Sequence, residues 1–179
     1  MKGIVFTSFL EMVENKFSLK VADEIIETSE LPSGGSYTTV GTYDHAEIIK
    51  LVMQLSVRTG ISASDLVRTF GEYLFTQLIE MHPYFAEENS SAFGLLQKVD
   101  SYIHVEVRKL YPDAELPAFH YEISTPDSLV MTYRSTRPFA DLAEGLIIGC
   151  IAYYGEKIDI RREDLSDGRS ARFALTKVG

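Results

Sequence analysis

The sequence contains a single cysteine, Cys150, among its 179 residues. One thiol cannot form an internal disulfide, and it cannot supply a zinc or iron–sulfur site built from several thiolates. We therefore expect a protein of the reducing cytoplasm. Because Cys150 lies in a largely apolar helical stretch, we expect its side chain to be inert packing.

Long hydrophobic runs are also missing. No stretch of about 18 apolar residues occurs, so we expect no transmembrane helix. Glu11 and Glu14 interrupt the apolar N-terminal stretch, so we expect no signal peptide. Lys and Arg number 17 against 26 Asp and Glu, giving a formal net charge of -9. A surface this acidic repels phosphate backbones and anionic lipids, so we expect neither nucleic acid nor a membrane as partner.

What remains is typical of a globular chain, with 45% hydrophobic and 24% charged residues. Apolar spacing is helical up to about residue 115 and strand-like after it. Helices are predicted over residues 2–16, 18–29, 45–58, 63–81 and 93–110. Asp44 should cap the third helix and Gly60 should end it, and Ser62 or Ser64 should cap the fourth.

The last third of the chain contains the predicted strands. These cover residues 118–124 and 128–134, joined at Pro126-Asp127, and residues 157–162 and 171–177, joined at Asp167-Gly168. A helix is predicted over 139–153, between the two strand pairs. This order predicts an α+β fold, helical over about 1–112 and α/β over about 113–179, with an antiparallel sheet packed on one face by helix 139–153. We expect residues 1–179 to form one domain.

The four histidines, His45, His82, His104 and His120, show no paired metal-binding spacing such as HExxH. His104 lies within a predicted helix between Ile103 and Val105. A lone histidine beside apolar residues is more often a structural residue than a ligand, and the residues alone leave both interpretations open.

A polar motif closes the second predicted strand. Tyr133, Ser135 and Arg137 form Tyr-x-Ser-x-Arg, and in an extended segment alternate side chains point the same way. Two hydroxyls beside a guanidinium can bind a carboxylate, such as a heme propionate. The alternative interpretation is a polar, solvent-exposed strand face.

Taken together, the motifs resemble the H-NOX (heme-nitric oxide/oxygen binding) family over nearly the whole chain. The matching residues are Met1-Lys2-Gly3, His104, Pro117, Tyr133, Ser135 and Arg137. The resemblance implies heme b between the helical and α/β parts, with His104 as the only protein ligand of the iron. It also implies that the Tyr-x-Ser-x-Arg residues hold the propionates and that Pro117 presses on the heme plane. A single histidine ligand leaves the sixth iron position open for a diatomic gas.

The resemblance also bears on which gas is bound. Oxygen-binding members carry a distal tyrosine five residues after the motif arginine, where this chain has Leu142. The other distal positions match Val5, Phe9, Leu74, Leu78 and Leu146. None of these side chains donates a hydrogen bond, which favours nitric oxide and carbon monoxide over oxygen. Tyr73 would supply a donor if the alignment is shifted by one residue, and the apolar residues also suit simple core packing.

The function implied by the family is nitric oxide sensing. Nitric oxide binds opposite His104, the bond from iron to His104 breaks, and the change in shape regulates another protein. No kinase, cyclase or phosphodiesterase segment follows the last strand, so we expect a non-enzymatic protein acting on a separate histidine kinase or cyclic-di-GMP enzyme. The alternatives are an oxygen-binding sensor, an interaction module without cofactor, and a heme enzyme or redox protein. A heme enzyme needs a polar distal acid–base group, and the sequence offers none.

Overall fold

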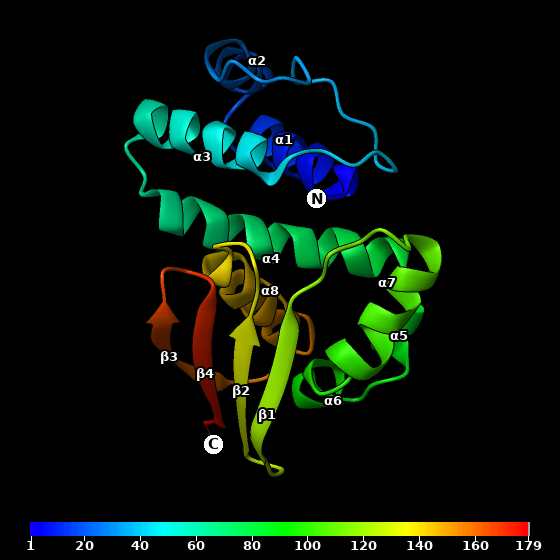
Figure 1. The fold of residues 1–179 in the computed structure, drawn as a ribbon. Helices are drawn as coiled ribbons and strands as arrows, with labels where there is room; N and C mark the ends of the chain where they lie inside the picture. Colours follow the sequence, from blue (N-terminus) through cyan, green and yellow to red (C-terminus); the bar gives the residue numbers. More distant parts are fainter. Residues whose placement is uncertain (179) are drawn as a thin grey trace.

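The computed structural model describes residues 1–178, in a set of helices followed by a four-stranded sheet (Figure 1). The first helices are α1 (Gly3–Lys16), α2 (Leu19–Thr28), α3 (His45–Thr59) and α4 (Ala63–Met81). Their predicted ends are confirmed by the capping contacts. Asp44 accepts from the N–H of Ala46, Ser62 rather than Ser64 caps α4, and Gly60 ends α3 at a φ of 75°.

The single helix predicted over residues 93–110 is wrong. The structure has instead α5 (Tyr84–Glu87), α6 (Ala92–Leu96), the π-helical turn η1 (Val99–Ile103) and α7 (His104–Leu110). Within the turn, the N–H of Ile103 bonds to the carbonyl of Lys98, five residues earlier. A π turn takes one more residue than an α turn, so apolar spacing on either side of it no longer follows one helical period.

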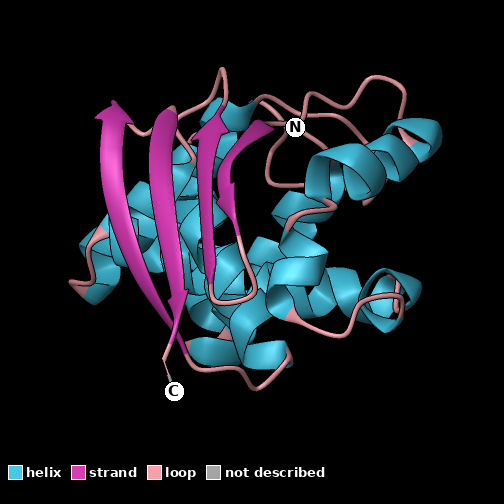
Figure 2. Cartoon of the chain, turned by 90° about the horizontal axis from the view of Figure 1, so that it is seen from below, coloured by secondary structure: helices cyan, strands magenta, loops and turns pink. Residues whose placement is uncertain are grey.

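The sheet contains β1 (Ala118–Ser124), β2 (Ser128–Arg134), β3 (Ile158–Ser166) and β4 (Ser170–Lys177), with α8 (Ala140–Tyr153) between β2 and β3. Its order is β1-β2-β4-β3 and all neighbours are antiparallel. In Figure 2 the helices lie against one face of the strands. The predicted α+β class is thus confirmed. β1 and β2 match their predicted ranges, whereas β3 runs four residues beyond its predicted end.

Two hydrophobic cores are built around these elements. The first joins α1 to α4 and contains Phe9 and Phe70. The second joins the inner face of the sheet to α8, α5, α6 and the end of α4, and contains Phe75 and Phe173. Leu146 of α8 packs against both. Helices α4 and α8 therefore belong to both cores and connect them.

Glycines bring α4 and α8 into close contact. A Cβ on Gly145 would lie 2.0 Å from the carbonyl oxygen of Arg68, and one on Gly71 would lie 2.5 Å from the carbonyl oxygen of Leu142. No side chain fits at either distance, so the crossing of the two helices depends on both glycines. Among the described residues, no helix is both long and apolar enough to span a membrane.

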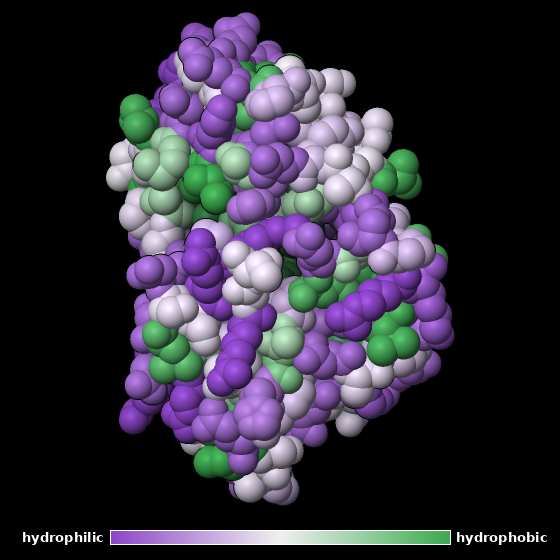
Figure 3. Space-filling model, in the orientation of Figure 1, coloured by the Kyte–Doolittle hydropathy of each residue, from purple (hydrophilic) through white to green (hydrophobic). Residues whose placement is uncertain are grey.

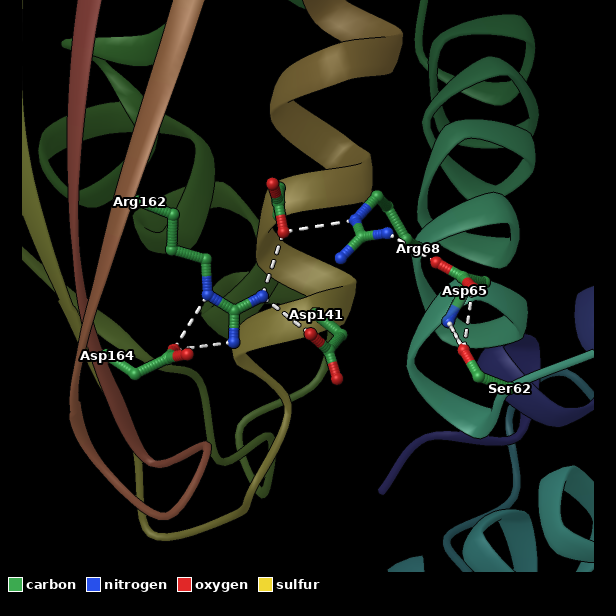
Figure 4. Close-up of polar contacts among 7 residues, drawn as sticks. Ser62, Asp65, Arg68, Asp141, Arg162 and Asp164 are labelled. Carbon is green, nitrogen blue, oxygen red and sulfur yellow. Dashed lines mark hydrogen bonds and ion pairs between the residues drawn. The ribbon is translucent and has the colours of Figure 1, made fainter.

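Charged side chains reinforce the same crossing (Figure 4). Arg68 of α4 donates to Glu144 of α8 at 3.1 Å, and Arg162 of β3 donates to Glu144 at 2.8 Å and to Asp141 at 2.5 Å. Arg162 also pairs with Asp164 at 2.6 Å. Burial disfavours the charged guanidinium of Arg162, but these carboxylates outweigh burial and raise its pKa. The network connects α4, α8 and β3 through largely buried groups.

Candidate functional site

His104 is held in one orientation at the start of α7. Its ring is buried, and its Nδ1 lies 2.8 Å from Oδ1 of Asp100. An ionised carboxylate can only accept, so Nδ1 is the protonated nitrogen of the neutral ring. Burial lowers the pKa of His104, against the opposing effect of Asp100, and so favours that neutral ring. Within residues 1–178 the ring makes its hydrogen bond through Nδ1 and none through Nε2, which leaves the Nε2 lone pair available to a metal.

Asp100 is a site residue that the sequence analysis missed. Its second oxygen, Oδ2, accepts a hydrogen bond from the backbone N–H of Phe119 at 2.7 Å, in β1. The only available signal was an acidic residue four positions before a histidine in a helix, a spacing that places two side chains on one face. The Phe119 contact spans 19 residues and has no local signature.

The donor set fits a porphyrin better than a bare metal ion. No group of three or more His, Cys, Asp or Glu side chains within the described residues could hold a metal. His104 alone offers one nitrogen, which suffices for an iron whose other four in-plane ligands come from a porphyrin. The surroundings of His104 therefore fit heme.

The predicted propionate motif lies where β2 passes into α8. β2 ends at Arg134, so Ser135 and Arg137 belong to the following loop. Tyr133 is 3% exposed and belongs to the second core, so it is not part of a solvent-exposed face. Burial raises the pKa of Tyr133, while hydrogen bonding to Ser135 and to the Phe139 backbone opposes the rise. The two hydroxyls are thus neighbours.

Arg137 meets the segment that carries Pro117. Its guanidinium donates to Oε2 of Glu115 at 2.6 Å and to the Glu115 carbonyl at 3.3 Å. Its side chain is 14% exposed, against 70% for Glu115. Ser135 and Glu115 line a cavity of about 500 Å³, together with Leu116 and other residues of the same loops. Of the three motif residues, only Ser135 lines this cavity, and the guanidinium of Arg137 is engaged with Glu115 at its rim.

The six predicted distal residues come together from three helices. They are Val5 and Phe9 of α1, Leu74 and Leu78 of α4, and Leu142 and Leu146 of α8, and all belong to or pack against the first core. Phe9 and Leu74 are buried, whereas the other four are only half-buried. Figure 3 shows this face of the molecule hollowed near its middle, with hydrophobic residues visible inside.

His104 lies beside the second core, whereas the distal candidates pack mainly in the first. The ring of His104 lies 6.2 Å from the ring of Phe119, which packs against the second core. The distal residues belong to the first. Tyr73 packs at the edge of the first core, and its hydroxyl accepts a hydrogen bond from Asn15 at 3.1 Å at the surface. His104 thus neighbours the sheet side of the domain, and the apolar distal candidates come from α1, α4 and α8.

Comparisons with known proteins agree with this arrangement. The model of the Haem-NO-binding family matches residues 2–162. The unliganded Fe(II) H-NOX protein from K. algicida is 39% identical with a TM-score of 0.95, covering 100% of this chain and 97% of that one. The Fe(II)CO H-NOX from Shewanella woodyi, bound to IWP-051, is 43% identical with a TM-score of 0.84, covering 99% and 95%.

A third solved relative is an Fe(II)NO H-NOX protein from S. oneidensis. It is 25% identical with a TM-score of 0.91 and covers all of both chains. No curated protein matches. H-NOX domains bind heme and serve as gas sensors, and the family model spans most of this chain. The chain therefore belongs to the H-NOX family of heme-based gas-sensing domains.

Proposed function

We propose that this protein is a nitric oxide sensor whose heme iron is bound by His104. The observation that carries the proposal is the His104 ring, fixed by Asp100 through Nδ1 and unbonded at Nε2 within the described residues. Residues 1–179 would form one heme-binding domain, with heme b between the helical part, about 1–112, and the α/β part, about 113–179. The heme supplies the iron that binds the gas, and the chain supplies everything else.

In this proposal the chain orients the heme by binding its propionates and by contacting its plane. Tyr133, Ser135 and Arg137 bind the propionates, because two hydroxyls beside a guanidinium suit a carboxylate. Arg137 contributes the strongest donor, and it reaches the Pro117 segment through Glu115. Pro117 presses on the heme plane. The state of the heme is thereby communicated to the segment between α7 and β1.

Gas selectivity comes from the distal residues. Val5, Phe9, Leu74, Leu78, Leu142 and Leu146 exclude water and offer no hydrogen-bond donor. Bound oxygen carries negative charge and benefits from a donor, whereas nitric oxide and carbon monoxide bind ferrous iron without one. Relatives solved with these two gases support the assignment. The hydroxyl of Tyr73 is engaged with Asn15, which weighs against an oxygen-binding sensor.

Signalling would follow from loss of the bond between His104 and the heme iron. His104 would hold α7 and its neighbours to the heme, and displacement of His104 by nitric oxide would release them. The two parts of the domain then shift, and a separate histidine kinase or cyclic-di-GMP enzyme responds to the new surface. The protein itself carries out no catalysis. This requires that both states differ in their contacts with the partner.

Absorption spectroscopy of the purified ferrous protein tests the proposal. We expect a Soret band, a spectral change with nitric oxide and with carbon monoxide, and no stable oxygen complex in air. A colourless protein that does not take up added heme would contradict the heme proposal. A stable oxygen complex in air would favour the oxygen-sensor alternative.

A further inference from the structure

We infer that Asp100 is the positioning residue that transmits the state of His104 to β1. This inference rests on the proposed function, because it concerns what happens when His104 gains or loses the iron. Asp100 is not a ligand and does not touch the gas. Its role follows from the two different hydrogen bonds that its carboxylate accepts.

The carboxylate of Asp100 lies between His104 of α7 and Phe119 of β1. Oδ1 accepts from the side chain of His104 at 2.8 Å, and Oδ2 accepts from the backbone of Phe119 at 2.7 Å. One donor is a ring that would bind the iron, and the other belongs to the second residue of β1, two positions after Pro117. A displacement of the ring therefore reaches the first residues of β1 through the two hydrogen bonds of Asp100, beside the contact of the His104 ring with the Phe119 ring.

The π turn η1 provides the geometry for this arrangement. Asp100 belongs to the turn and His104 follows it directly, and the N–H of His104 bonds to the carbonyl of Val99, five residues earlier. The wider π turn advances less around the axis per residue than an α turn, so residues four apart lie closer to one line along the helix. Asp100 therefore lies beside the ring and also reaches β1. Energetically costly π turns inside helices are frequent at functional sites.

A second contact ties β1 to the same region. The hydroxyl of Tyr121 donates to the carbonyl of Leu96, at the end of α6, at 2.6 Å. Burial raises the pKa of Tyr121, so this hydroxyl stays protonated and remains a donor. The Tyr121 contact does not involve His104. Asp100 therefore supplies the hydrogen-bonded link from His104 to β1, beside the contact between the rings of His104 and Phe119.

The carboxylate also acts on the ligand atom itself. A negative charge accepting from Nδ1–H increases the electron density at Nε2 and so strengthens a bond from Nε2 to iron. Loss of such a partner typically weakens metal binding about ten- to hundredfold. Asp100 would thereby influence how readily His104 is displaced from the iron. It would also link that displacement to β1.

The test compares Asp100→Ala and Asp100→Asn with the wild type as heme-loaded and heme-free proteins. Alanine removes both acceptors, and asparagine leaves one oxygen for two donors. Asp159→Ala is the matched control, because Asp159 is an exposed β3 carboxylate that pairs only with Arg161 at 3.4 Å. Amide hydrogen exchange at Phe119 reports the bond to β1, and the iron–histidine stretching vibration of the unliganded ferrous protein reports the bond to His104.

In Asp100→Ala we expect exchange at Phe119 to rise about ten- to hundredfold in both heme-loaded and heme-free protein, the range for a lost bond to a charged acceptor. We also expect a lower iron–histidine frequency and no further change at Phe119 when nitric oxide is added. In Asp100→Asn at least one of the two readouts should move, even if the alanine variant does not fold. The Asp159→Ala control should match the wild type in both.

Two results would overturn the inference. The first is Phe119 exchange in Asp100→Ala within twofold of the Asp159→Ala value. The second is an Asp100→Asn variant with both readouts unchanged. Failure of the proposed function has a different signature, because His104 would then stay on the iron in wild-type protein exposed to nitric oxide. In that case the role of Asp100 would still be tested by amide exchange at Phe119 in the heme-free protein and by the iron–histidine stretching frequency of the unliganded ferrous protein.

Discussion

Replacing Leu142 by tyrosine should convert the gas selectivity of this domain. Leu142 is half-buried on α8 and packs against the core that contains Phe9 and Leu74. A phenol reaching bound oxygen would donate to a strongly polarised acceptor, which is worth about 1.5–3 kcal/mol. At about 1.4 kcal/mol per factor of ten, oxygen affinity should increase roughly ten- to hundredfold.

The structure also indicates what the substitution costs. The carbonyl of Leu142 lies against Gly71, where even one added methyl would be 2.5 Å away, so the α8 backbone cannot move toward α4 to make room. The ring must instead turn toward the exposed side of the half-buried Leu142 position, and overpacking of a core typically costs about 1–3 kcal/mol of folding free energy. Leu142→Phe carries the same ring without the hydroxyl and is the matched control.

The assay is an oxygen titration of reduced wild type, Leu142→Phe and Leu142→Tyr, followed by absorption. Only Leu142→Tyr should form an oxygen complex that persists in air. Equal oxygen affinities for the tyrosine and phenylalanine variants would refute the proposed position of the hydroxyl. A persistent oxygen complex in the wild type would refute the nitric oxide assignment and indicate a donor elsewhere, with Tyr73 the first to replace.

Three further substitutions test the site and its support. His104→Gly should lose heme unless imidazole is added, and a stable ferrous heme spectrum without imidazole would refute the assignment of His104. Arg137→Ala should lose heme faster to a competing heme-binding protein, because a charged donor to the propionates is missing; an unchanged rate would place the propionates elsewhere. Gly145→Ala should clash with the Arg68 carbonyl and lower the free energy of unfolding by about 1–3 kcal/mol, which is measured as a lower unfolding midpoint. Gly94→Ala, a helical glycine with no neighbour closer than 3.3 Å, should not show this loss.

Local signals explain why most of the fold could be predicted. β1 and β2 match their predicted ranges because alternation and the Pro126-Asp127 turn are short-range features. Asp44, Gly60 and Ser62 mark helix ends for the same reason. The region of η1 could not be predicted in this way. Apolar spacing assumes hydrogen bonds to the fourth preceding residue, and the bond from Ile103 to Lys98 skips one more.

The site was less accessible to residue-level reasoning than the fold. His104 alone could not be distinguished from a structural histidine, and only the combined motifs raised it to a candidate ligand. The partner of its Nδ1 atom, Asp100, is local, yet the bond from Asp100 to Phe119 exists only once β1 has folded back against η1. Such a contact between distant segments leaves no periodicity to detect. Prediction from sequence therefore identified the ligand candidate without the residue that orients it.

Four of the six distal candidates are less buried than the centre of the core against which they pack. By type, the distal leucines are indistinguishable from Leu51 or Leu55, which are fully buried in the same core. Leu142, Leu146, Leu78 and Val5 pack against this core but are only half-buried. Covering apolar surface is favourable by about 25 cal/mol per Å², so a heme packed against these four side chains would gain from their burial. Nε2 of His104 makes no hydrogen bond among the described residues, so in the proposed site one heme would take this nitrogen as its ligand and cover the half-buried side chains as well.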